Sequence, residues 1–107
     1  MTKCEFFRDG ARITGFSISG HSGYAEAGSD IVCAAISAVV GMVEATINDV
    51  CGGKAKVRVK EADARITLTL PSSCDEEDAV QAVLSGMLLT LVNFAEDYPD
   101  YIEVLEV

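Results

Sequence analysis

The chain has 107 residues, half of them apolar, and a formal net charge of −9 at pH 7, which predicts one domain around a single modest core. Only eight lysines and arginines are present, too few for the concentrated basic patch that nucleic-acid binding requires. The sequence has neither a continuous apolar run of membrane-spanning length nor an apolar leader, so we expect a cytoplasmic protein that binds neither nucleic acid nor membrane.

The chain begins with two extended runs, residues 3–9 and 12–19, on either side of an Asp-Gly dipeptide. This pattern is typical of a β-hairpin. The second run leads into a stretch rich in glycine, which we expect to form a loop. The loop contains His21, the only histidine of the chain. Its glycines are Gly20, Gly23 and Gly28.

A helical pattern runs from residue 30 to about residue 50 and is apolar on most sides, which predicts a buried central helix. Ser29 or Asp30 would serve as its N-cap, which places Cys33 in the first turn. Unpaired N–H groups and the positive end of the helix dipole favour the thiolate there, the reactive form of cysteine. Ser37 lies one turn further along the same face, where it either supports the thiol or hydrogen-bonds its own backbone.

The second half of the chain repeats the hairpin and helix pattern. Apolar residues alternate in residues 54–61 and 64–70, which predicts a second hairpin with one inward face on each strand. A second helix with a broad apolar stripe follows, from the acids at residues 75–78 to about residue 97, and residues 101–107 form a closing strand. The order ββαββαβ predicts an α+β fold, with two helices packed on a mostly antiparallel sheet.

The charged and sulfur-bearing side chains show no pattern typical of a metal centre. The four cysteines include no C-x-x-C pair, and the acids at residues 75–78 are explained by the start of a helix. We therefore expect no metal and no cofactor, and thiols rather than disulfides.

Basic residues at alternate positions of one strand form either a basic stripe or, as is more common, the solvated face of that strand. These residues are Lys54, Lys56, Arg58 and Lys60.

A thiol at a helix N-terminus, with a histidine from the preceding loop, is an arrangement that nucleophilic catalysis uses. Spacing alone does not establish that Cys33 and His21 meet in space. The alternative from the residues alone is a buried structural cysteine and an ordinary surface histidine.

Residues 20–38, GHSGYAEAGSDIVCAAISA, resemble the signature of the bacterial ribosomal-processing cysteine protease family, approximately G-H-A-x-Y-A-x-x-G-x-D-I-V-C-A-A-V-S. The sequence departs from this signature at Ser22, where alanine is usual, and at Ile36, where valine is usual. The segment FAEDYPDYIEVLE near the C-terminus and the chain length also match. The resemblance therefore covers nearly the whole chain and implies that residues 1–107 form a single cysteine-protease-like domain.

The resemblance implies a homodimeric endopeptidase that removes an N-terminal extension from the large-subunit ribosomal protein number twenty-seven, in support of ribosome assembly. Its catalytic dyad would be His21 and Cys33, with the N–H groups around Cys33 and Ala34 stabilising the oxyanion. Asp30 either orients the imidazole or caps the helix. The loop residues expected near the peptide are Gly20, Ser22, Gly23, Tyr24 and Gly28.

Two other functions remain open at this point. One is a non-catalytic module of the same fold that binds the ribosomal protein without cutting it. The other is a thiol redox protein or transferase that uses Cys33 alone, and it would keep its activity when His21 is replaced.

Overall fold

The structure, a computed structural model, describes residues 1–20 and 27–107. Its described strands form one sheet in the order β3-β4-β2-β1-β5. All neighbours are antiparallel except β1 and β5, which are parallel, so the predicted mostly antiparallel sheet is confirmed. The strands are β1 (Thr2–Asp9), β2 (Arg12–Ser19), β3 (Lys56–Lys60), β4 (Arg65–Thr69) and β5 (Ile102–Glu106).

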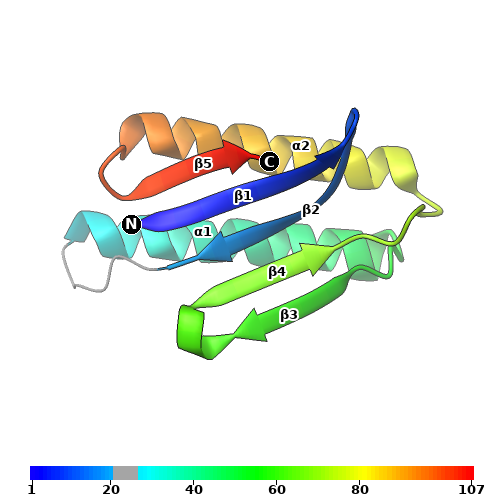
Figure 1. Cartoon of the computed structure of the whole chain (residues 1–107), viewed down its shortest axis with the longest axis horizontal. Helices are drawn as coiled ribbons and strands as arrows, with labels where there is room; N and C mark the ends of the chain where they lie inside the picture. Colours follow the sequence, from blue (N-terminus) through cyan, green and yellow to red (C-terminus); the bar gives the residue numbers. More distant parts are fainter. Residues whose placement is uncertain (21–26) are drawn as a thin grey trace.

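Two long helices lie side by side against one face of this sheet, as Figure 1 shows. The first, α1 (Ala27–Ala45), continues into the short π-helix η1 (Thr46–Val50), and the second is α2 (Glu77–Asp97). The element order ββαββαβ and the α+β fold are therefore as predicted. Gly52, with φ at +62°, follows the end of η1, a position where glycine tolerates the left-handed backbone.

The hydrophobic core lies between the helices and the sheet. Each helix turns one stripe of apolar residues toward the strands, because residues three and four apart share a helix face. Burial of these side chains is the main stabilising contribution of the fold. The helices contribute Val32, Ile36, Val40, Val43, Val80, Leu84, Met87 and Leu91, and the strands contribute Cys4, Phe6, Ile13, Phe16, Ile18, Leu68 and Ile102.

The second hairpin differs from the prediction at its edge strand. A 3-10 turn, η2 (Glu61–Asp63), joins β3 to β4, and Ala64 adopts a left-handed backbone with φ at +47°. Val59 was predicted to face inward, but its side chain is 67% exposed. Figure 1 shows the reason, because β3 is the outermost strand and lies beyond α1. Lys56, Arg58 and Lys60 are exposed, as expected for the solvated face of a strand.

Both helices are long and apolar enough to cross a membrane by length and composition alone. The mean hydropathy of an 18-residue window is 1.8 within Ile31–Val50 and 1.4 within Glu77–Asp97. Core helices of water-soluble proteins meet the same criterion. Here each helix buries one face against the sheet, which is what a core helix of an α+β domain does.

Candidate active site

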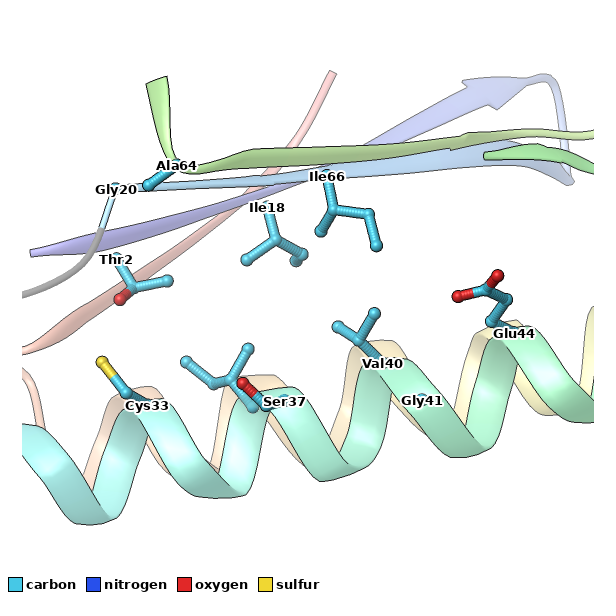
Figure 2. Close-up of a pocket in the computed structure, with 11 residues that line it drawn as sticks. Thr2, Ile18, Gly20, Cys33, Ser37, Val40, Gly41, Glu44, Ala64 and Ile66 are labelled. Carbon is cyan, nitrogen blue, oxygen red and sulfur yellow. The ribbon is translucent and has the colours of Figure 1, made fainter. Parts of the chain in front are cut away.

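A cleft of about 400 Å³ opens between α1 and the sheet. Figure 2 shows α1 on one side of it and the strands on the other. From α1 the cleft is lined by Cys33, Ile36, Ser37, Val40, Gly41 and Glu44. From the strands and the segments beside them it is lined by Thr2, Ile18, Gly20, Ala64 and Ile66.

The thiol of Cys33 and the hydroxyl of Ser37 lie on the same side of α1 and point toward the sheet (Figure 2). They are four residues apart, so they occupy successive turns of one helix face. The structure thus brings together two side chains that the sequence placed on one face. Cys33 is half-buried and Ser37 is exposed, so the cleft gives a ligand access to both.

The start of α1 differs from the prediction. The helix begins at Ala27, so Asp30 lies inside its first turn and is not the N-cap, and Cys33 lies in the second turn. The predicted N-cap role of Asp30 and the first-turn position of Cys33 are therefore wrong. Ser and Asp favour a helix cap, but an acid is also stabilised inside the first turn by the helix dipole, so these residue types do not fix the boundary.

The earlier helix start also changes the assignment of the oxyanion donors. Only the first four N–H groups of a helix, those of the N-cap and of the first three helical residues, lack a partner within the helix, and in α1 all of them precede Asp30. Cys33 and Ala34 lie beyond that stretch, so their N–H groups belong to the regular helix ladder. The expectation that these two groups stabilise an oxyanion is accordingly not supported by the position of the helix.

The other three cysteines, all described by the structure, lie outside the cleft, and no disulfide joins any of the four. Cys4 is fully buried in the core, and this burial raises its pKa to about 12. Burial and the Glu77 carboxylate also raise the pKa of Cys74, whose sulfur lies 3.6 Å from the carbonyl oxygen of Gly53. Cys33 is therefore the cysteine whose position suits reaction with a bound molecule.

Several residues of the predicted site fall where the structure gives no side-chain detail. His21, Ser22, Gly23 and Tyr24 lie outside the described residues. Gly28 lies in the first turn of α1.

Gly20, the residue before His21 in the chain, lines the cleft. Its φ is +75°, and a Cβ added there would lie 2.8 Å from the carbonyl oxygen of Met1. Glycine is therefore required at this position, directly after the end of β2.

Of the described residues that line the cleft, the sequence indicated only Gly20, Cys33 and Ser37. Glu44 could have been found, because it is eleven residues from Cys33, about three helical turns, on the same face of α1. Thr2 and Ala64 could not, because their approach to the cleft depends on the strand order of the sheet. Among the described residues, no group of three or more His, Cys, Asp or Glu side chains is placed to hold a metal ion.

Comparison with known proteins places this chain in one family. A family model described as cysteine protease Prp matches residues 1–103. The ribosomal processing cysteine protease Prp of Bacillus subtilis (strain 168) is 34% identical over 95 residues, which are 86% of this chain and 84% of that protein. The essential ribosomal processing protease Prp from S. aureus has the same fold in a substrate-peptide complex, with a TM-score of 0.87 and 22% identity. Its complex with a covalently linked product peptide has a TM-score of 0.85 and 23% identity. In both structures the match covers 100% of each chain.

These findings define the class of the protein first. A chain-long family match and the 34% identical relative make it a cysteine protease, an enzyme that hydrolyses peptide bonds. More particularly, the chain belongs to the family of the cysteine protease Prp. The family resemblance carried by residues 20–38 is thereby confirmed.

Proposed function

We propose that this protease removes the N-terminal extension of the large-subunit ribosomal protein number twenty-seven in the cytoplasm, with Cys33 and His21 as its catalytic dyad. The observation that carries the proposal is the thiol of Cys33, which lines an open cleft large enough for a peptide segment. A ribosomal substrate is supported by the B. subtilis relative, which is named as a ribosomal processing protease. Binding of a peptide is supported by the S. aureus complexes, which hold a substrate peptide and a covalently linked product peptide.

In the proposed mechanism His21 takes the proton of the Cys33 thiol, and the sulfur attacks the carbonyl carbon of the scissile bond. The C–N bond then breaks, His21 returns the proton to the departing amine, and the acyl group stays on the sulfur as a thioester. Water, deprotonated by His21, hydrolyses the thioester and regenerates the thiol. No cofactor takes part in these steps.

Asp30 and Ser37 act in this proposal as positioning residues. Asp30 would orient the imidazole of His21. Ser37 lies one turn from Cys33 along the same side of the cleft and supports the thiol there. Gly20, which lines the cleft, and the loop residues Ser22, Gly23 and Tyr24 would contact the peptide beside the thiol.

The test is mass spectrometry of the host ribosomal protein after incubation with the unmutated enzyme, Cys33→Ala, His21→Ala and Cys51→Ala. Cys51 is the matched control, because it is also half-buried but lies outside the cleft. We expect one N-terminal cut with the unmutated chain and Cys51→Ala, and none with the other two.

Three other outcomes would contradict the proposal. A cut by Cys33→Ala would remove the thiol from the mechanism. Activity that survives His21→Ala would favour a redox or transferase enzyme that uses Cys33 alone. Tight binding without any cut by the unmutated chain would favour the non-catalytic module.

We also propose that the enzyme is a homodimer that buries the outer face of its helices. Ile31 and Met42 are each 57% exposed, and they are eleven residues apart and therefore on one face of α1. Leu89 of α2 is 63% exposed. Sedimentation velocity should give a dimer for the unmutated chain and a monomer for Met42→Glu. A monomeric unmutated chain would refute this proposal.

A further inference from the structure

The hydroxyl of Thr2 is the one buried side-chain nitrogen or oxygen in the described part of the chain that has no hydrogen-bond partner. Thr2 is 3% exposed and opens β1, where it pairs with Ile102 of β5. Its backbone N–H donates to the carbonyl oxygen of Tyr101 at 2.8 Å. Its side-chain hydroxyl, in contrast, has no hydrogen-bond partner among the described residues.

An unsatisfied buried hydroxyl is destabilising, because the group loses its hydrogen bonds to water on folding. Valine has nearly the same shape without the hydroxyl and is well suited to a strand. Folding alone gives no reason for threonine here. A bound molecule that accepts a hydrogen bond from the hydroxyl would explain why threonine is present.

The position of the hydroxyl indicates what that molecule is. Thr2 lines the same cleft as Cys33, and Figure 2 shows its oxygen on the side that faces α1, across from the Cys33 sulfur. The walls beside them are largely aliphatic, with Ile18, Val40 and Ile66. A peptide that lies in such a cleft brings main-chain carbonyl groups that would otherwise lose their hydrogen bonds to water.

We propose that Thr2 is a substrate-binding residue whose Oγ1 donates a hydrogen bond to a main-chain carbonyl oxygen of the peptide beside Cys33. This inference rests on the proposed function only in taking Cys33 as the reacting group. Because the bond is made to the main chain, it holds the peptide in register at the thiol whatever the side chains of the substrate are. It also gives the reactive end of the cleft a fixed donor on the sheet side.

The experiment compares Thr2→Val, which removes the hydroxyl, with Thr2→Ser, which keeps it. The matched control is Thr67→Val, because the Thr67 hydroxyl lies 3.3 Å from its partner, the Ser17 hydroxyl, and is not part of the cleft. Each variant is assayed for cleavage of a synthetic peptide that spans the N-terminal extension of the host ribosomal protein. The dissociation constant of the same peptide is measured by calorimetry in the Cys33→Ala background, where no cut occurs.

We expect Thr2→Val to raise both KM and the dissociation constant about tenfold, the effect of one lost hydrogen bond. Its Tm should equal or exceed that of the unmutated chain, because the hydroxyl has no hydrogen bond to lose in the described part of the free protein. Thr2→Ser should stay within about twofold of the unmutated chain. Thr67→Val should show the opposite pattern, with a lower Tm and unchanged cleavage.

Two results would overturn the inference. One is a Thr2→Val variant with unchanged KM and dissociation constant. The other is equal impairment of Thr2→Val and Thr2→Ser with a lowered Tm, which would assign Thr2 a purely structural role. If the unmutated chain does not cut the peptide, the proposed function fails, whereas the calorimetric comparison still tests Thr2.

Discussion

The polar groups near the two ends of β2 differ in whether they have hydrogen-bond partners. At its start, Arg12 donates to both carboxylate oxygens of Glu77, at 2.7 and 3.1 Å, and to the carbonyl oxygen of Pro71 at 2.8 Å. We call this group, Arg12 with Pro71, Cys74 and Glu77, the corner cluster. At its end, Gly20 leads to the cleft, where the Thr2 hydroxyl has no partner among the described residues.

This difference shows which polar groups stabilise the fold and which are available to bind a substrate. Hydrogen bonds that the chain satisfies by itself hold the fold, and they leave nothing for a ligand to bind. Polar groups that the chain leaves unsatisfied in a cleft lower the stability and become useful only when a substrate is bound. Mutations in the corner cluster should accordingly change stability alone, and mutations that remove the cleft's functional groups, the Cys33 thiol and the Thr2 hydroxyl, should lower activity without lowering stability.

The largest expected effect contrasts the cysteines of the two regions. Cys33→Ala should lower kcat/KM by at least about a thousandfold, as loss of a nucleophile does, whereas Cys74→Ala should leave it unchanged. In the folded unmutated chain, iodoacetamide should alkylate Cys33 first and Cys4 last. Burial raises the pKa of Cys4 to about 12, so its thiolate is scarce at neutral pH. Peptide mapping by mass spectrometry measures the order, and equal labelling of Cys33 and Cys4 would contradict it.

The sequence was sufficient to predict the elements and the reactive face of α1. The Asp-Gly hairpin pattern identified the first two strands, and alternation of apolar residues identified the two strands of the second hairpin. The spacing of Cys33 and Ser37 placed them on one side of the helix. It did not fix the start of α1, because Ser29 and Asp30 are suited both to a cap and to a first turn.

On the sheet side of the cleft, the residues other than Gly20 could not be predicted from the sequence, for a different reason. Thr2 reaches the cleft because β1 lies inside the sheet between β2 and β5, and β5 is about a hundred residues away along the chain. No local pattern reports such a pairing. Val59 shows the same limit, since its alternation predicted burial but the strand order put it at an open edge.

A smaller effect is expected from Gly20→Ala at the cleft end of β2. The substitution forces a residue with a Cβ into a left-handed backbone and brings that Cβ against the carbonyl oxygen of Met1. We expect a loss of about 1–2 kcal/mol in the free energy of unfolding, together with a larger loss of cleavage than stability explains. Urea unfolding and peptide cleavage measure the two effects. Gly10→Ala is the matched control, with φ at +61° and no atom within 4 Å of the added Cβ, and it should lower stability alone.

The corner cluster should give a pH-dependent stability that the cleft does not. The hydrogen bonds from Arg12 lower the pKa of Glu77 below its ordinary value of 4.5. Between the two pKa values the folded state therefore binds fewer protons than the unfolded state. The Arg12–Glu77 interaction thus stabilises the fold at pH values above the ordinary pKa of Glu77. This stabilisation is lost as the pH falls through the lower pKa that Glu77 has in the folded state. We expect Glu77→Gln to lower the free energy of unfolding at pH 7 by about 1 kcal/mol and to flatten its decline in acid. Urea titrations at a series of pH values measure this, and an unchanged decline would remove Glu77 as its cause.

The smallest expected effect concerns charge at the far end of the cleft. Among the described residues, Glu44 is the only charged one that lines the cleft, and it forms no ion pair with any of them. The chain also carries a net charge of −9, so a basic peptide is attracted both locally and at long range. Glu44→Lys should raise the KM for such a peptide about threefold to tenfold at low ionic strength, and the difference should shrink as salt is added, because ions screen exposed charges. Glu96→Lys makes the same change of net charge on the exposed surface of α2, outside the cleft, and should have a weaker effect. If both variants raise KM equally, the attraction comes from the net charge of the protein and not from Glu44 in the cleft.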